Sequence, residues 1–228
     1  MTHQNNRIKI FTDIYETNIW GKNSSNNNSY KGTSGDGSSI SYNTKTYIPL
    51  IKQFIKSNNI TTVVDLGCGD WQSSYLIYND IDISYFGYDA YKQVCINNNK
   101  NYPQYNFTHL DFIKDKNHLQ NADLCIIKDV LQHLCNNDVV ELLKYIITNK
   151  KYKYIIITNC FNQLFDNQDV VNGDFRKLTA KMDPLKQFNP KIICNYGTKE
   201  VCLIDSSIVY NDNFVFNPMN TNINFSLI

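Results

Sequence analysis

The sequence predicts an α/β protein built on a mainly parallel, seven-stranded β-sheet with an antiparallel hairpin at one edge. Short apolar segments alternate with amphipathic helical segments, a pattern typical of parallel sheets that are covered on both faces. The first apolar segment ends in a turn with two glycines, at the position where open α/β sheets bind ligands. With 228 residues and 42% hydrophobic content, the chain can bury one large core.

Strands and helices are expected to alternate after residue 45. The predicted parallel strands cover residues 63–66, 83–88, 105–109, 124–127 and 154–158. The predicted helices cover residues 47–55, 71–78, 91–99 and 138–148. We expect Asp138 and Glu141 to form a capping pattern at the start of the last helix. Two later segments, 191–197 and 200–210, lie close enough in sequence to pair as the antiparallel edge hairpin.

The N-terminal part differs from the rest of the chain. Apolar residues recur at helical intervals over residues 7–20, and this run ends at Gly21. Residues 22–41 are polar and without periodicity, which predicts a mobile loop. We therefore divide the chain into an N-terminal helix and flexible lid segment, residues 1–44, and a main domain, residues 45–228.

Charge and hydropathy exclude several classes of partner. The net charge of +1 gives no overall attraction to a phosphate backbone or to anionic lipid, so nucleic acid and membranes are not expected partners. No segment approaches the roughly 18 to 20 apolar residues of a membrane-spanning helix, and no secretory leader is visible. We expect a cytoplasmic protein, in the host cytoplasm if the AT-rich codon bias behind its many Asn, Ile, Lys and Tyr residues belongs to a virus.

The cysteines indicate the redox state of the protein, and the rare arginines indicate a candidate site. Seven cysteines without a CxxC pair indicate reduced thiols, and neither a disulfide framework nor a zinc site is expected. The chain has two arginines, Arg7 and Arg176, and uses lysine as its ordinary cation. A central arginine such as Arg176 therefore suggests a site that needs the planar guanidinium.

The turn after the first strand predicts a nucleoside-containing cofactor. Gly67 and Gly69 allow a ligand to approach the backbone closely, and Asp65 lies at the end of the strand. Asp89 ends the next strand, where a carboxylate can accept both hydroxyls of a ribose. The dinucleotide pattern G-x-G-x-x-G is incomplete, because Gln72 stands at the third glycine position. This favours a cofactor without a pyrophosphate.

The segment VVDLGCGD, residues 63–70, resembles the first motif of the class I S-adenosylmethionine-dependent methyltransferases, which have a Rossmann-like fold. The resemblance implies that Asp65, Gly67 and Gly69 surround the methionine part of S-adenosyl-L-methionine and that Asp89 holds the ribose. The chain departs from many members at Trp71, where a third glycine is common. The resemblance further implies that Asp111 and Phe112 flank the adenine and that Lys128 lies in the cofactor site.

A narrower resemblance extends over most of the chain. It is similar to a subgroup with four motifs, found here as residues 14–21 (IYETNIWG), 34–38 (SGDGS), 125–134 (CIIKDVLQHL) and 167–176. These motifs imply substrate or lid contacts from Tyr15, Trp20, Ser34, Gly35 and Arg176. Lys128 departs from the subgroup, where arginine is usual. Members are associated with glycan biosynthesis, so the resemblance implies a small-molecule or glycan acceptor with a sugar hydroxyl.

Methyl transfer to a hydroxyl requires that the protein align the methyl donor with the acceptor and remove one proton from the acceptor hydroxyl. Asp129 and His133 are four residues apart, so they share a helix face if the helix after the fourth strand begins near residue 129. His133 is then expected to act as the base, with Asp129 holding the imidazole. Asp129 acting alone, or as a ligand of a divalent metal, is the alternative, although no ligand cluster is visible and no metal is expected.

Other interpretations stay open at this stage. Each of four candidate residues also has a purely structural interpretation. His133 can be a packed core histidine and Asp111 a turn cap, while Trp20 can be a packing anchor and Arg176 part of a surface ion pair. The acceptor can be an amine, so an N-methyltransferase acting on an amino sugar or small amine is an alternative function. A catalytically inactive partner subunit with this fold is the other. Nucleic-acid methylation ranks third because no basic stripe is present.

Overall fold

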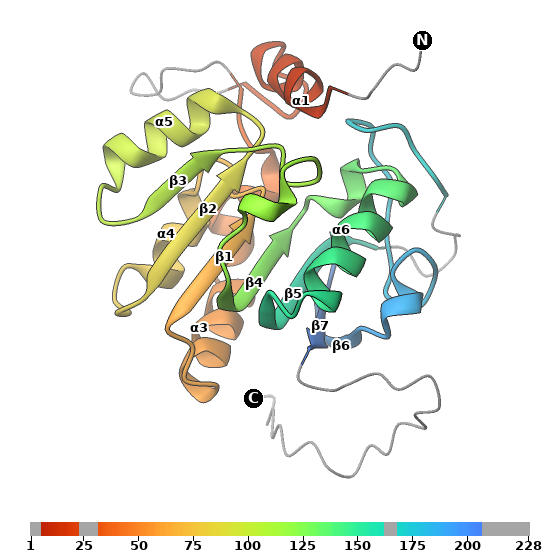
Figure 1. The fold of residues 1–228 in the computed structure, drawn as a ribbon. Helices are drawn as coiled ribbons and strands as arrows, with labels where there is room; N and C mark the ends of the chain where they lie inside the picture. Colours follow the sequence, from red (N-terminus) through yellow and green to blue (C-terminus); the bar gives the residue numbers. More distant parts are fainter. Residues whose placement is uncertain (1–5, 23–31, 162–167, 207–228) are drawn as a thin grey trace.

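The computed structural model describes residues 6–22, 32–161 and 168–206, and a seven-stranded sheet forms its centre (Figure 1). The strand order is β3-β2-β1-β4-β5-β7-β6. The strands are β1 (Thr62–Leu66), β2 (Ser84–Asp89), β3 (Asn106–His109), β4 (Ala122–Lys128), β5 (Tyr152–Cys160), β6 (Lys191–Tyr196) and β7 (Lys199–Asp205). Strands β1 to β5 pair in parallel, and β7 pairs antiparallel with both β5 and β6. The predicted fold class is confirmed.

Helices cover both faces of the sheet. The helices are α1 (Arg7–Glu16), α2 (Ile40–Asn43), α3 (Tyr47–Ser57), α4 (Gln72–Tyr78), α5 (Lys92–Asn101) and α6 (Asn136–Thr148). Adjacent residues of a strand point to opposite faces, so Val63 packs into one core with α3, α4 and α5, and Val64 packs into a second core with α6. None of the helices in the described ranges is long and apolar enough to span a bilayer.

Helix α1 lies above the carboxyl ends of the parallel strands, at the top of Figure 1. It is shorter than the predicted helix over residues 7–20, because Thr17 caps it with a backbone bond to Asp13 and Asn18 takes a left-handed φ of +59°. The helix buries Ile14 and Tyr15 against the rest of the protein. This placement puts the N-terminal segment next to the site where open α/β sheets bind ligands.

Two predicted helix starts are wrong. Helix α6 begins at Asn136, and Asp138 does not form the predicted cap with Glu141, since its carboxylate binds Arg7 and Asn172. No helix begins near residue 129 in this described stretch. Asp129 has a φ of +60°, and residues Leu131–His133 form one 3₁₀ turn, η3.

Parts of three sequence predictions lie outside the described residues. These parts are residues 23–31 of the predicted loop, Asn167 of the fourth motif and residues 207–210 of the second hairpin segment.

Candidate active site

A cavity opens at the carboxyl ends of β1, β2 and β4, and α1 forms part of its wall. The sequence-predicted residues that line it are Tyr15, Trp20, Ser34, Asp65, Gly67, Gly69, Asp89, Asp111, Phe112, Lys128, Asp129 and His133. Gly35 and Arg176 are not among the described lining residues. The topology therefore brings together side chains that come from the first 38 residues and from the ends of four strands.

The loop after β1 can hold only glycine at two positions. Gly67 and Gly69 have φ values of +78° and +57°, a region that other residues seldom adopt. A Cβ atom on Gly67 would lie 2.3 Å from Cγ2 of Val130, and one on Gly69 would lie 2.5 Å from Oγ of Ser34. Glycine at these two positions thus lets the loop backbone pack directly against Val130 and Ser34, which also line the cavity.

Asp65 and Asp89 are buried at the carboxyl ends of β1 and β2. Burial raises the pKa of Asp65 to about 7, although the hydroxyl of Tyr85 donates a hydrogen bond of 2.8 Å to it. Burial likewise raises the pKa of Asp89 to about 6, against the effect of the backbone N–H groups of Tyr91 and Gly69, which donate to its two oxygens. A cationic ligand in the cavity would stabilise the ionised form of both carboxyls.

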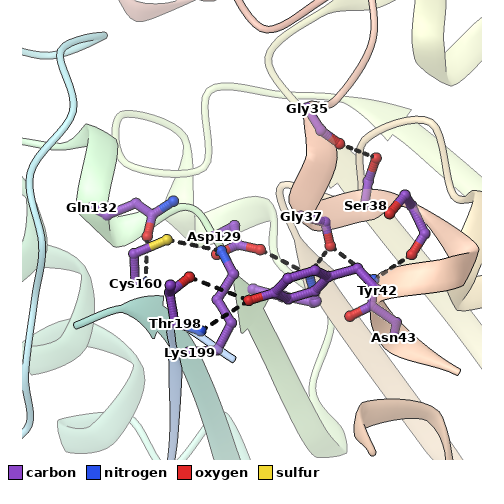
Figure 2. Close-up of polar contacts among 12 residues, drawn as sticks. Gly35, Gly37, Ser38, Tyr42, Asn43, Asp129, Gln132, Cys160, Thr198 and Lys199 are labelled. Carbon is purple, nitrogen blue, oxygen red and sulfur yellow. Dashed lines mark hydrogen bonds and ion pairs between the residues drawn. The ribbon is translucent and has the colours of Figure 1, made fainter. Parts of the chain in front are cut away.

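Asp129 is held between two lysines, of which Figure 2 labels Lys199. Nζ of Lys128 lies 2.8 Å from Oδ2 of Asp129 and donates to the carbonyl of Gly37 at 2.6 Å. Nζ of Lys199, on β7, contacts Oδ1 of Asp129 and lies 3.0 Å from Sγ of Cys160. Burial alone would raise the pKa of Asp129, but the two ammonium groups outweigh it and the pKa is lowered. Asp129 is therefore an ionised carboxylate and a weak base.

His133 ends the 3₁₀ turn η3, and its imidazole faces the cavity. Nδ1 lies 3.0 Å from the carbonyl oxygen of Asp174, so this nitrogen carries the proton and donates to it. Burial lowers the pKa of His133, because the hydrogen bond to Asp174 and the charge of Asp129 do not compensate for it. The predicted role of Asp129 as the partner of the imidazole is corrected, since the backbone of Asp174 takes that place.

Aromatic rings surround the imidazole of His133. The ring of Trp20 lies 4.8 Å from it and that of Phe175 lies 5.7 Å from it, measured between centroids. Phe11 of α1 lies 5.9 Å from Trp20 and also lines the cavity. The side of the cavity near His133 is thus aromatic, and neither Phe11 nor Phe175 was predicted as a site residue.

The N-terminal segment contacts the glycine loop directly. Tyr15 stacks on Tyr91 with 4.4 Å between ring centroids, and its hydroxyl shares a hydrogen bond of 2.7 Å with Oγ of Ser34. Gly35 takes a φ of +82° next to Trp20, so it shapes the turn and does not reach the cavity. Ser34 and Ser38 therefore line the cavity directly beside the glycine loop.

Arg7 was not predicted as a site residue, and it joins α1 to two carboxylates. Its Nε lies 3.0 Å from Oδ1 of Asp111, and one terminal nitrogen lies 2.7 Å from Oδ2 of Asp138. Asp111 also accepts the backbone N–H groups of Ile113 and Lys114, so it caps its own turn as well as lining the cavity. The rarity of arginine in the sequence was the available signal for Arg7.

Arg176 is not among the described residues that line the cavity, and its predicted contact with a ligand stays a prediction. Its guanidinium donates to the carbonyl oxygens of Leu134 and Gln168 and contacts Asp169 at 3.3 Å. The backbone N–H of Gly173, in the same motif, donates to the carbonyl of His133. The described residues of this motif, 168–176, therefore stabilise the turn that carries His133.

No protein-family model matches the chain, and no curated protein matches its sequence. Solved structures match its fold. Human N-acetylserotonin methyltransferase in complex with SAM superposes with a TM-score of 0.55 at 15% identity, over 70% of this chain and 51% of that chain. Mitomycin 7-O-methyltransferase MmcR superposes with a TM-score of 0.53 at 15% identity, over 69% of this chain and 53% of that chain. The chain thus spans about half the length of these two proteins.

A third similar structure is matched over almost its whole length. Magnesium protoporphyrin IX methyltransferase (ChlM) from Synechocystis PCC 6803 with bound SAH gives a TM-score of 0.57 at 12% identity, over 86% of this chain and 98% of that chain. Identities this low establish the architecture and not the activity. The seven-stranded sheet described above therefore has the Rossmann-like fold of the class I S-adenosylmethionine-dependent methyltransferases.

Proposed function

We propose that this protein is an S-adenosylmethionine-dependent methyltransferase that methylates a hydroxyl group of a sugar, either in a nucleotide sugar or in a glycan. One observation carries the proposal. The glycine loop after β1, the carboxylate of Asp89 and the neutral imidazole of His133 all face the same cavity. The first two features suit a nucleoside cofactor, and the third suits removal of a proton from an acceptor.

The residues present fit the cofactor. Gly67 and Gly69 line the cavity, and a Cβ atom at either position would clash with Val130 or Ser34, so the loop presents bare backbone at this wall. Asp89 ends β2, in the position from which a carboxylate binds ribose hydroxyls in this class of sheet. Among the described lining residues, five carboxylates face two cations, Arg7 and Lys128. This excess of negative charge favours a cationic ligand such as a sulfonium.

The chemistry assigned to the protein is limited to alignment and proton removal. When bound, S-adenosyl-L-methionine supplies a methyl group that its sulfonium already activates. The carbonyl of Asp174 fixes the proton of His133 on Nδ1, so Nε2 carries the lone pair that would accept the hydroxyl proton of the acceptor. The side-chain amide nitrogen of Gln132 donates to this lone pair over 3.4 Å, so the acceptor hydroxyl has to displace that contact. Asp129 stays ionised between its lysines and stabilises the imidazolium that forms. A general base of this kind contributes about 10² to 10⁴ in rate.

Two features support a sugar as the acceptor. The rings of Trp20 and Phe175 flank the imidazole, and the apolar faces of sugar rings pack well on aromatic side chains. The four sequence motifs resemble those of enzymes associated with glycan biosynthesis. Helix α1, Trp20, Ser34 and Ser38 contribute to the wall of the cavity, which supports the proposal that the segment 1–44 acts as a lid on the domain 45–228.

The test combines binding with product analysis. We expect isothermal titration to show binding of S-adenosylmethionine and S-adenosylhomocysteine, and a radiolabelled methyl group to transfer to a nucleotide sugar or free sugar. Mass spectrometry of the product should place the methyl group on oxygen. Transfer to nitrogen of an amino sugar would contradict the choice of acceptor atom, and binding without any transfer would favour the inactive partner subunit. Failure of both ligands to bind would contradict the proposed function as a whole.

A further inference from the structure

Asp70 is a buried carboxylate in the cavity wall with one oxygen unpaired. It directly follows Gly69, it is 6% exposed, and it lines the cavity. Its Oδ2 accepts hydrogen bonds from the backbone N–H of Ser34 at 3.2 Å, from Oγ of Ser38 at 3.4 Å and from Nε2 of Gln72 at 3.2 Å. Its Oδ1 is buried and has no hydrogen-bond partner among the described residues.

An unpaired carboxylate oxygen at this depth indicates a missing donor, because buried polar atoms in native proteins are almost always hydrogen-bonded. The nearest charges do not fill the position. Lys128 influences Asp70 electrostatically, yet its ammonium group donates to Asp129 and Gly37. Asp89 lies close enough to interact with Asp70 and repels a second negative charge. The donor that is missing should therefore be a cation.

We propose that Oδ1 of Asp70 binds the primary ammonium group at the amino-acid end of the cofactor. This inference depends on the proposed function, because it assigns a residue to the same ligand. The ammonium is the only cationic hydrogen-bond donor of S-adenosylmethionine, since the sulfonium has no N–H and the adenine amino group is neutral. Asp70 adjoins the glycine loop, so the amino-acid end of the ligand is the part that can reach it.

The N-terminal segment fixes the orientation of this carboxylate. The backbone N–H of Asp70 donates to Oγ of Ser34 at 2.7 Å, while the N–H of Ser34 donates back to Oδ2. The hydroxyl of Ser38 also donates to the carbonyl of Gly35 at 2.8 Å, which closes the turn that carries both serines (Figure 2). The backbone of Ser34 and the hydroxyl of Ser38 therefore hold Oδ2, and Ser38 is a positioning residue for this carboxylate.

The test compares ligands that differ only at the amino-acid end. S-adenosylhomocysteine carries the ammonium, and 5′-methylthioadenosine lacks the whole amino-acid part. In isothermal titration, Asp70→Asn should weaken binding of S-adenosylhomocysteine by about 10- to 100-fold, the usual effect of losing a charge-assisted hydrogen bond. Binding of 5′-methylthioadenosine should change less than about twofold. Asp80→Asn, which changes an exposed aspartate paired with Lys52, is the matched control and should leave both affinities unchanged.

Two further measurements separate the possible explanations. Decarboxylated S-adenosylmethionine keeps the amine and lacks the carboxylate, so Asp70→Asn should weaken its binding by the same factor. Ser38→Ala should weaken the binding of S-adenosylhomocysteine by about three- to tenfold and spare that of 5′-methylthioadenosine, since it removes a hydroxyl that donates to Oδ2 of Asp70 and leaves the charge of Asp70 in place. This second variant also tests the assignment if Asp70→Asn does not fold.

The outcomes are distinct. Equal affinities of wild-type protein and Asp70→Asn for S-adenosylhomocysteine would overturn the assignment and leave the proposed function standing. Equal weakening of S-adenosylhomocysteine and 5′-methylthioadenosine would also overturn it, because the variant would then have disturbed the whole loop. Failure of the wild-type protein to bind either ligand would overturn the proposed function together with the assignment.

Discussion

Lys199 and Asp129 form an ion pair that is almost closed to solvent, although 70 residues separate them in the chain. The side chain of Lys199 is 5% exposed and that of Asp129 is 16% exposed. Strand β7 inserts antiparallel beside β5, and this position brings Lys199 to the end of β4, where Asp129 follows. The pair therefore connects the edge hairpin to the cavity, and it keeps a carboxylate ionised next to the candidate base His133.

Replacing Lys199 should destabilise the protein through Asp129. Lys199→Met leaves the buried carboxylate with Lys128 alone, so we expect the free energy of unfolding to fall by about 3 kcal/mol, the lower end of the range for a broken buried pair. The pKa of Asp129 is lowered in the folded state, so the loss should be present above pH 4 and shrink in acid. Urea unfolding of the wild-type protein and the variant at several pH values measures this loss of unfolding free energy. Lys52→Met removes one partner of an exposed ion pair and should change the free energy of unfolding little. An equal loss of stability in both variants would show that the buried pair of Lys199 and Asp129 has no special role.

His133→Asn should lower kcat by about 10² to 10⁴ and leave the affinity for S-adenosylmethionine unchanged, because the imidazole is assigned to the acceptor and not to the cofactor. Burial lowers the pKa of His133, so the acid limb of the wild-type kcat profile should lie below pH 6.5. His118→Asn, an exposed histidine, is the control. An unchanged kcat for His133→Asn would remove His133 from the mechanism.

Arg7 should hold helix α1 over the cavity. Arg7→Gln loses the ion pairs with Asp111 and Asp138, so we expect amide hydrogen exchange in α1 to accelerate by at least about tenfold. Affinity for S-adenosylhomocysteine should fall as well, because Arg7 lines the cavity. Lys9→Gln is the matched control on the same helix, since Lys9 forms an exposed pair with Asp13. Exchange rates that respond equally to both variants would show that Arg7 does not anchor the helix.

Asp65 should make the stability of the ligand-free protein depend on pH. Its pKa is about 7 in the folded state, above the ordinary value of 3.8, so the folded state binds more protons between these values. This site therefore lowers the free energy of unfolding as pH rises from about 4 to about 7, by at most about 1.4 kcal/mol per pH unit. His133 acts in the opposite direction, because its pKa is lowered.

The informative quantity is therefore the difference between wild-type protein and Asp65→Asn. The variant keeps a side-chain oxygen that can accept the hydrogen bond of Tyr85 and cannot titrate. We expect the difference in free energy of unfolding to change steadily over pH 4 to 7 in favour of the variant. Parallel curves over that range would show that Asp65 titrates normally.

The sheet and the cofactor loop could be predicted because their signals are local. Strand β1 follows from a continuous apolar run, and Gly67 and Gly69 have a direct steric reason in the 2.3 Å and 2.5 Å approaches that a Cβ atom would make. The edge hairpin likewise follows from two adjacent apolar segments. These features depend on residues that are neighbours in the sequence.

The segment around His133 could not be predicted in the same way. Its apolar residues have helical spacing, but the carbonyls of Gln132 and His133 accept backbone N–H groups from Arg176 and Gly173. These tertiary bonds replace the bonds that a helix would make, and the chain forms one 3₁₀ turn before α6 begins. The pairs formed by Lys199 and Arg7 depend on the register of distant elements, which no local pattern records.

The most direct test of cofactor binding is titration of S-adenosylmethionine into the wild-type protein and into Asp89→Ala. The structure places Asp89 at the end of β2, where it holds the N–H of Gly69 and faces the cavity. We predict saturable, stoichiometric binding by the wild-type protein and by the surface control Asp80→Ala, and loss of binding by Asp89→Ala. Equal binding by Asp89→Ala, or no binding by the wild-type protein, would contradict the assignment of this cavity to the cofactor.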